Sequence, residues 1–372
     1  MNPSISALSE EGDIYRFTLS GVNVSFANAI RRTILTDIPI TVIQTDTYEN
    51  NQCTITANTG RLHNEILKQR LSCIPIHDKP DKKKELELPG KYILEVNVTN
   101  TTENILYVTT ADFKLKNKET GEYKSAEETR TFFPPNSKTN YFIDFARLRP
   151  KMGDGIPGEQ LSLTAEFSIG TAKMNSMYNV VSKCAYGNTQ DVAKVATVWE
   201  EMEAKLRSDN TTQADIDFKR RDFGFLDAQR HFVANSFDFV LQTVGIYENR
   251  ELVQRACAVL QNKFIDMIQA LDSDMVPIFN SETTMDNCYD VLLEGEDYTV
   301  GKVLEYILYE KHYMGDKTLS FCGFKKFHPH NTDATIRLAF DLKSEKDLIR
   351  QYLRESCMEA QELFKSVYHM FD

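Results

Sequence analysis

The stretch VNVSFANAIRRTIL, residues 22–35, gives the strongest indication of how this chain folds. Ser25 offers a hydroxyl group that can cap the start of a helix, and Pro39 ends the pattern. Between them, apolar residues recur at a spacing of four: Phe26, Ile30 and Ile34. Residues at this spacing share one face of a helix, so the stretch predicts an amphipathic helix that covers a core.

The same stretch carries two adjacent arginines, Arg31 and Arg32, in a chain whose formal net charge is -11. Binding nucleic acid over a wide surface needs clustered Lys and Arg to neutralise phosphates, so the acidic balance favours a protein partner instead. Guanidinium groups pair with carboxylates at buried interfaces better than lysine does. The pair therefore predicts a protein contact, with a solvated helix face as the alternative.

Length and composition are those of a globular protein with two or three domains: 372 residues, of which 41% are hydrophobic and 26% charged. No apolar run approaches the roughly 18 residues of a membrane-spanning helix, and the N-terminus does not resemble a signal peptide. The seven cysteines are scattered, odd in number and without a C-x-x-C pair. This usage predicts an intracellular chain without a disulfide framework or zinc ribbon.

Composition shifts divide the chain into three predicted parts. A solvated run begins at His77, and short strand-like pieces follow it, so residues 77–160 predict an inserted, mostly β subdomain. Residues 1–76 and 161–275 then form one discontinuous module. It contains a polar excursion at about 188–225, predicted as a helix over 192–206 followed by a loop. Residues 280–372 form a second module.

The second module repeats the opening pattern. YDVLLEGEDYTVGKVLEYIL, residues 289–308, can be laid over FTLSGVNVSFANAIRRTIL, residues 17–35, at one constant offset. Both copies predict a strand, a glycine turn, a hydroxyl cap and an amphipathic helix. The matched pairs are Leu19 with Leu293, Gly21 with Gly295, Ser25 with Thr299, Ala27 with Gly301, Ile30 with Leu304, and Ile34 with Leu308. Arg31 and Arg32 fall on Glu305 and Tyr306, so the basic pair is not part of the repeat.

Each module also ends in a long predicted helix, at about 249–271 and 344–371. We expect their apolar stripes to bury each other about a pseudo-two-fold axis, together with the short helix of the second copy. The residues expected at this intramolecular interface are Val253, Leu260, Phe264, Leu271, Leu304, Leu308, Ile349, Leu353, Leu363 and Phe364.

The first module resembles the family of the bacterial RNA polymerase alpha subunit, the archaeal D subunit and the third-largest eukaryotic subunit. SFANAIRRTILTDIP is similar to the family's N-terminal helix. HNEILKQRLSCIPI is similar to its next helix, with the ending carried by Arg70, Leu71, Ile74 and Pro75. GTAKMNSMYNVV keeps the family's Gly170 and Lys173, but Asn175 and Tyr178 replace a His and a Trp. FDFVLQTVGIYENRELVQRACAVL resembles its closing strand and long helix.

The second module resembles a shorter relative, archaeal subunit L or the eleventh-largest eukaryotic subunit. EDYTVGKVLEYIL carries that motif through Asp297, Thr299, Gly301 and Leu304, and GFKKFHPHNTDATIRLAF carries its loop through Gly323, Phe324, His328 and Pro329. A fused chain of this kind resembles the arrangement in large DNA viruses that encode their own polymerase.

The resemblance implies an α+β fold in which two alpha-subunit-type dimerisation modules pack as an intramolecular pseudo-dimer. It implies a non-catalytic platform for the two large catalytic subunits, with small zinc-binding subunits nearby and DNA contacted only through the complex. Docking on a large subunit then falls to Asn28, Arg31, Arg32 and Arg70. No cofactor, membrane contact or homodimer is implied. The implied location is intracellular: a viral factory and virion for a virus, otherwise the nucleus or archaeal cytoplasm.

Other interpretations stay open at this point. Cys322, His328 and His330 could ligate a metal, but C-x5-H-x-H fits no common closed zinc pattern, and residues 77–161 contain no cysteine. His63 and Glu65, or carboxylates such as Asp144 and Asp154, could form an acid–base pair, but no motif fixes their geometry, and neither G-x-S-x-G nor a Walker A run occurs. A free DNA-binding transcription factor and a stand-alone α+β enzyme are the alternative functions.

Overall fold

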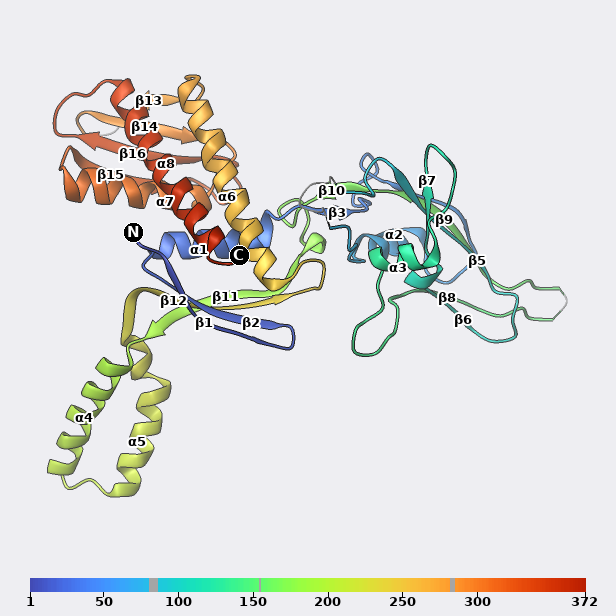
Figure 1. Cartoon of the computed structure of the whole chain (residues 1–372), viewed down its shortest axis with the longest axis horizontal. Coiled ribbons are helices and arrows are strands. Elements are labelled where there is room, and N and C mark those ends of the chain that lie inside the picture. Colours follow the sequence, from blue (N-terminus) through green and yellow to red (C-terminus); the bar gives the residue numbers. More distant parts are fainter. Residues whose placement is uncertain (80–85, 154, 282–284) are drawn as a thin grey trace. The chain divides into compact units, whose positions relative to one another are not determined.

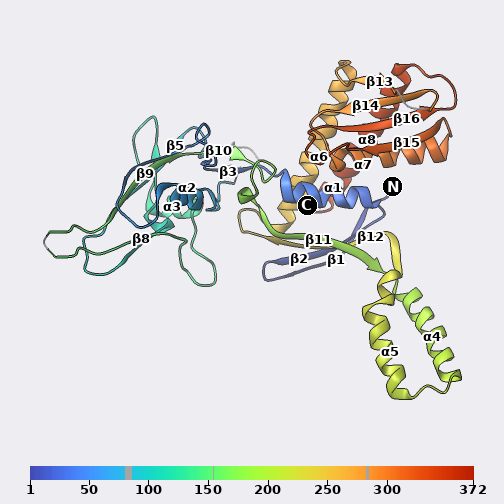
Figure 2. The same cartoon turned by 180° about the vertical axis from the view of Figure 1, so that it is seen from behind.

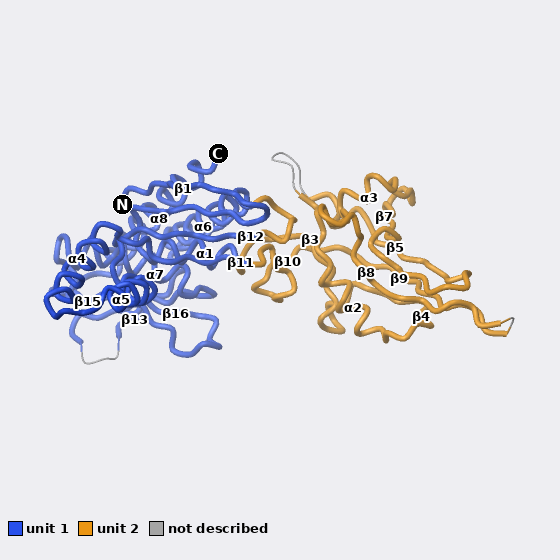
Figure 3. Tube along the Cα trace, turned by 90° about the horizontal axis from the view of Figure 1, so that it is seen from below, with its two compact units in different colours: residues 1–34, 183–242, 249–372 blue, residues 35–182, 243–248 orange. Residues whose placement is uncertain are grey.

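A computed structural model describes residues 1–79, 86–153, 155–281 and 285–372 (Figure 1). The chain divides into two compact units, shown in blue and orange in Figure 3. The first unit holds residues 1–34, 183–242 and 249–372, and the second holds residues 35–182 and 243–248. Helices and antiparallel sheets occur in both, so the predicted α+β class is confirmed.

The first unit begins with a four-stranded sheet. Its order is β1 (Ser4–Glu11), β2 (Ile14–Ser20), β12 (Phe232–Thr243) and β11 (Val181–Gln190). Alternate residues of β2 are buried because strand side chains point to opposite faces. Phe17 stacks on Phe239 of β12 with ring centroids 4.8 Å apart. The helices α1 (Val24–Thr36) and α6 (Asn249–Asp272) follow β2 and β12 in the chain.

A second four-stranded sheet completes this unit. Its order is β13 (Ile278–Asn280), β14 (Cys288–Leu293), β16 (Ala334–Phe340) and β15 (Leu319–Lys325). The accompanying helices are α7 (Tyr298–Leu308), a π-helical turn at Tyr309–Gly315 and α8 (Lys346–His369). Figure 2 shows α6 and α8 side by side, and the two helices pack against each other.

The strand, turn and helix of the repeat occur in both copies. Gly21 and Gly295 have φ angles of +76° and +68°, a left-handed conformation that glycine adopts at no steric cost. The prediction that Ser25 and Thr299 cap the helices was wrong. Ser25 N–H donates to Asn23 Oδ1 at 2.9 Å, and Thr299 N–H donates to Asp297 Oδ1 at 2.8 Å. The helices begin one residue after Asn23 and Asp297, so these matched residues, rather than the hydroxyls, hold the cap positions.

The polar excursion of the first unit is a pair of helices, α4 (Val192–Ser208) and α5 (Gln213–Phe225), followed by a short 3-10 turn at Asp227–Arg230. The predicted helix is present, but the loop predicted after it was wrong, because α5 forms there. Ile216 and Phe223 of α5 pack with Trp199 of α4 in a small separate core. This burial stabilises α5, although most of its residues are polar.

The described residues of the second unit form three sheets. The largest has the order β4 (Cys53–Asn58), β9 (Gln160–Glu166), β5 (Tyr92–Thr99) and β7 (Lys114–Asn117). The others pair β6 (Leu106–Thr109) with β8 (Asp144–Leu148), and β3 (Ile40–Val42) with β10 (Ser168–Gly170). The helices are α2 (Asn64–Ser72), α3 (Ala126–Phe132) and 3-10 turns at Thr110–Asp112 and Ser176–Tyr178.

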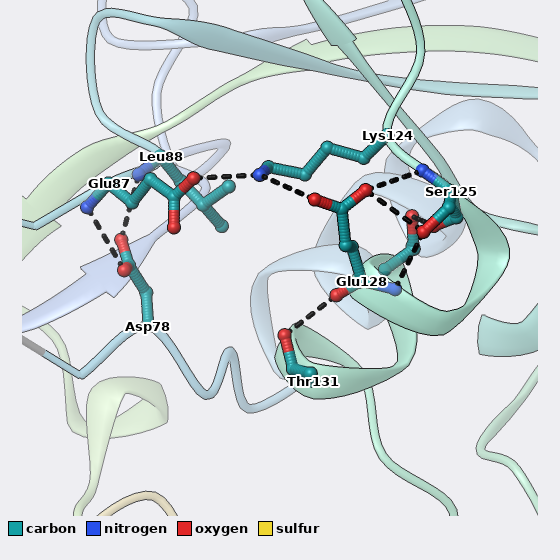
Figure 4. A network of polar contacts seen from close by, with 8 residues as sticks. Asp78, Glu87, Leu88, Lys124, Ser125, Glu128 and Thr131 are labelled. Carbon is teal, nitrogen blue, oxygen red and sulfur yellow. Dashed lines mark hydrogen bonds and ion pairs between the residues drawn. The ribbon is translucent and has the colours of Figure 1, made fainter.

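A polar network ties the second unit together (Figure 4). The buried carboxylate of Asp78 accepts hydrogen bonds from Thr41 Oγ1 at 2.9 Å and from the backbone N–H groups of Glu87 and Leu88 at 3.1 and 3.0 Å. Lys124 Nζ lies 2.7 Å from Glu87. Burial alone would lower the pKa of Lys124, but the hydrogen bond and charge of Glu87 outweigh it and raise that pKa. Because its hydrogen bonds are satisfied in this way, the buried carboxylate of Asp78 joins β3 to the segment before β5.

The compact units divide the chain at positions different from those of the three predicted modules. Compactness groups segments by their contacts, whereas the modules were defined by pattern and repeat. The division at 77–160 and 280–372 therefore stays a prediction. Asp154, inside the predicted insert, lies outside the described residues.

Candidate docking site

The first helix, α1, separates an apolar face from a polar one. Its buried residues are Phe26, Ala27, Ala29, Ile30, Thr33 and Ile34. Asn28, Arg31 and Arg32 lie on the partly exposed side. The spacing that buries one face therefore fixes where the predicted docking side chains lie.

Arg31 is oriented by its own helix. Its Nε donates a hydrogen bond to Asn28 Oδ1 at 3.0 Å, one turn earlier. Its positive charge also acts on Cys184 and Tyr186 of β11. Burial raises the pKa of Cys184 to about 12 and also raises the pKa of Tyr186, and Arg31 offsets part of both shifts. Asn28 and Arg31 are thus brought together beside β11 as one polar group.

Arg32 reaches the second half of the chain. Its Nη2 lies 2.5 Å from Asp297 Oδ2, and its Nε donates to Thr299 Oγ1 at 2.9 Å. Asp297 is the N-cap residue of α7, so one carboxylate both caps that helix and pairs with α1. Both side chains are about 30% exposed, at 30% and 27%, which places the pair between a surface and a buried salt bridge.

The charge of Asp297 is stabilised by these partners. Burial alone would raise its pKa, but hydrogen bonds from Thr299 and the neighbouring Arg32 guanidinium outweigh burial, so its pKa is lowered from 3.8. A carboxylate at a helix N-terminus is stabilised further by the helix dipole. The ionised form is therefore the one that the folded protein holds.

Arg70, the fourth predicted docking residue, belongs to the second unit. Its Nε donates to the carbonyl of Phe145 at 2.9 Å, and its Nη2 donates to the carbonyl of Asp144 at 2.6 Å. Both acceptors lie on β8, so Arg70 links α2 to that strand while its own side chain stays exposed. The structure thus brings Asn28 and Arg31 together and gives Arg32 and Arg70 separate intramolecular partners.

The predicted helix interface is buried. All ten residues, Val253, Leu260, Phe264, Leu271, Leu304, Leu308, Ile349, Leu353, Leu363 and Phe364, are at most 8% exposed. The rings of Phe264 and Phe364 stack at 5.9 Å between α6 and α8, and Phe26 of α1 lies 5.2 Å from Phe364. A face of this length would promote aggregation if it were exposed.

The residues considered for metal binding or acid–base chemistry are not brought into one site. Cys322 Sγ lies 3.7 Å from the carbonyl of Glu305, and burial raises its pKa to about 12. His328 and His330 lie on the surface with ring centroids 5.1 Å apart. His63 and Glu65 form an exposed pair at 3.0 Å. Within the described ranges, no three His, Cys, Asp or Glu residues gather as a metal site, and no helix could span a membrane.

The long helices α6 and α8 pack against each other, and α1, which carries the two arginines, lies beside them. This arrangement is that of an α+β protein whose core is a pair of long helices. Residues 16–264 match the family described as the RNA polymerase Rpb3/Rpb11 dimerisation domain. Because this match covers more than half of the chain, the protein belongs to that family. The predicted resemblance to RNA polymerase alpha-like subunits is thereby confirmed at family level. The match ends inside α6 and does not test a fusion with a second partner.

Individual relatives agree with this family. The DNA-directed RNA polymerase subunit Rpo3 of Pyrococcus furiosus is 26% identical over 294 residues, which span 72% of this chain and 98% of that protein. Rpo3 of Methanosarcina acetivorans is 24% identical over 282 residues, spanning 69% of this chain and 94% of that protein. The DNA-directed RNA polymerases I and III subunit rpac1 of Dictyostelium discoideum is 34% identical over 90 residues, 24% of each chain.

Two features of this site were missed in the sequence. The pairing of Arg32 with Asp297 joins residues far apart in the chain, and only the break in the repeat at Arg32 signalled a special role. The Asn23 cap could have been found, because asparagine is as good a cap residue as serine and matches Asp297 in the repeat.

Proposed function

We propose that this protein is a non-catalytic assembly subunit of a multisubunit DNA-directed RNA polymerase, and that it nucleates association of the two large catalytic subunits. Membership of the dimerisation-domain family and the similarity to two Rpo3 subunits over most of their length support the polymerase assignment. On this proposal the chain acts inside the cell and meets DNA only through the complex.

We further propose that two alpha-subunit-type modules are fused in this chain as a pseudo-dimer. The observation that carries this proposal is the packing of α6 against α8 within one chain. Each of these long helices is the last helix of one half of the pseudo-dimer, and each half also contains a four-stranded sheet and one copy of the strand–glycine–helix repeat. In a chain that supplies both halves, the surface used for dimerisation is already covered, so we expect no homodimer.

Asn28 and Arg31 are the residues we propose to dock on a large subunit. Arg31 is partly exposed, and its Nε hydrogen bond goes to Asn28 one turn earlier in the same helix, so its guanidinium can donate to carboxylates of another protein at low cost in ordering. Arg32 already forms an ion pair with Asp297. We propose that this pair positions α1 for docking, and that the exposed part of the Arg32 side chain also contacts the large subunit. Arg70, exposed beside β8, remains the proposed docking residue of the second unit.

Affinity purification of the tagged chain from its native source, followed by mass spectrometry, tests the proposal. We expect two very large subunits and small zinc-binding subunits to co-purify. Purification without any very large partner would contradict it. The electrophoretic mobility of a DNA duplex mixed with the purified chain distinguishes this proposal from the main alternative, a free DNA-binding transcription factor. An assembly subunit should bind DNA weakly or not at all, whereas a free transcription factor should bind at moderate salt.

A further inference from the structure

A groove in the second unit runs beside β8 and is bordered by four arginines. Its volume is about 630 Å³. Arg61 lies just before α2, Arg70 within α2, Arg147 within β8 and Arg149 just after β8. Four guanidinium groups around one groove are notable in a chain whose net charge is -11.

Two of these arginines, Arg70 and Arg149, are bonded to other groups that line the groove. Arg70 donates to the carbonyls of Asp144 and Phe145, as described above. Arg149 lies 2.5 Å from the carboxylate of Glu159, which is only 8% exposed and also accepts a hydrogen bond from the backbone N–H of Arg149 at 2.7 Å. Burial alone would raise the pKa of Glu159, but the hydrogen bonds and charge of Arg149 outweigh it, together with the charge of Arg61, so that this pKa is lowered.

The side chains of the remaining two arginines, Arg61 and Arg147, are exposed. Arg147 lies over the ring of Tyr107 at 5.0 Å, a contact that leaves guanidinium N–H groups able to donate. Arg61 is exposed beside Glu159. Across the part of the chain that the structure describes, neither Arg61 nor Arg147 has a carboxylate within the 4.0 Å of an ion pair.

Apolar side chains lie between these charges. Ile105, 56% exposed, the half-buried Leu62 and the buried Leu148 line the same groove. An exposed isoleucine beside two available guanidinium groups matches a ligand that carries both carboxylates and an apolar side chain.

We propose that this groove binds an extended acidic segment of a partner protein, with one carboxylate on Arg61, another on Arg147 and an apolar side chain against Ile105. The inference rests on the proposed function, because the partner would be a component of the same complex. A nucleic acid strand fits less well. Its phosphates recur at every nucleotide, whereas the exposed apolar side chain of Ile105 lines this groove together with the guanidinium groups.

A photo-crosslinking experiment on the full chain tests this inference. The photoreactive amino acid p-benzoylphenylalanine replaces Ile105 in the tagged chain, which is irradiated and purified from its native source. A second chain carries it at Tyr48, which is 99% exposed and lies outside the groove. Mass spectrometry then identifies the segment joined to each position.

Charge-reversed variants supply the decisive comparison. The double variant Arg61→Glu/Arg147→Glu removes the available charges, and Lys91→Glu/Lys114→Glu makes the same change in charge at exposed lysines of the same unit outside the groove. We expect the Ile105 crosslink to reach a segment with several Asp or Glu residues. It should fall at least about tenfold in the arginine variant and less than about twofold in the lysine variant. Arg61→Gln/Arg147→Gln gives the same comparison if charge reversal prevents folding, as judged by thermal unfolding.

Each contrary outcome overturns a specific statement. The inference fails if Ile105 gives no crosslink while two large subunits co-purify, or if the joined segment lacks carboxylates. It also fails if nucleic acid is the crosslinked species, or if both double variants behave alike. Absence of the large subunits from the purified unmodified chain would instead contradict the proposed function.

Discussion

Arg32 of α1 and Asp297 at the start of α7 form an ion pair with 2.5 Å between Nη2 and Oδ2, joining helices from opposite ends of the chain. The two residues occupy different positions of the repeat, since Arg32 matches Tyr306 and Asp297 matches Asn23. The contact is therefore asymmetric. It can distinguish the correct pairing of unlike halves from the pairing of two identical ones.

Removing this ion pair should destabilise the protein moderately. Arg32→Ala should lower the free energy of unfolding by about 1 kcal/mol, and Asp297→Ala by about 1–2 kcal/mol, because the second variant also loses the N-cap of α7. Urea denaturation of both single variants and the double variant measures the coupling. Additive effects would show that the two side chains do not interact in solution.

The stabilisation from Asp297 should depend on pH in one direction. Its pKa is lowered in the folded protein, so its contribution is complete above the unfolded value of about 3.8 and is lost as pH falls through the folded value. The difference in unfolding free energy between the wild type and Asp297→Asn should therefore be constant from pH 7 to about pH 5 and shrink below about pH 4. A difference that grows on acidification would contradict the assignment.

Arg31→Ala should impair docking without unfolding the chain. Among the described residues, Arg31 donates its side-chain hydrogen bond to Asn28 of the same helix, so its loss should change the free energy of unfolding by less than about 0.5 kcal/mol. Replacing both arginines also removes the pair with Asp297, so the single variant separates docking from stability. Co-purification of the large subunits is the measurement, and Lys183→Ala, an exposed change on β11, is the control. If the Arg31→Ala variant co-purifies with the large subunits as well as the wild type does, Arg31 is not a docking residue.

Phe364→Ala should be severely destabilising. Its ring is fully buried between Phe264 and Phe26, and the truncation leaves a cavity at the junction of three helices. Losses of about 3–5 kcal/mol are usual for such a change. Phe225→Ala on α5, where the ring is 81% exposed, should change stability by less than about 0.5 kcal/mol. Similar unfolding free energies for both variants would show that α8 is not packed as described.

Gly301→Ala should destabilise α7 although alanine is the better helix former. A Cβ at this position would lie 2.0 Å from Cε2 of Phe324, so the ring would have to move, at a cost of about 1–3 kcal/mol. Gly224→Ala in α5 has open space around the added Cβ and should be neutral or stabilising by up to about 1 kcal/mol. Thermal unfolding of the two variants compares these cases, and equal shifts would rule out the steric explanation.

Much of the fold could be predicted because its signals are periodic and local. The spacing of Phe26, Ile30 and Ile34 predicted α1, and the apolar stripes predicted α6 and α8 as buried helices. The glycine turns were found because Gly21 and Gly295 occupy the same place in a repeat. The loop predicted after α4 was wrong because α5 owes its stability to Trp199, a contact that no window of α5 contains.

The family motifs, the repeat and the buried faces of the helices could be found from the sequence, since each depends on neighbouring positions along one element. Which arginine is committed within the chain depends on contacts between distant elements, which the fold creates. Arg31 and Arg32 are adjacent and chemically identical, yet the helix turns them about 100° apart. One therefore meets Asn28 and β11, and the other meets Asp297. The direction in which each side chain points is not visible in the linear sequence. It leaves Arg31 available to a partner and commits Arg32 to a contact within the fold.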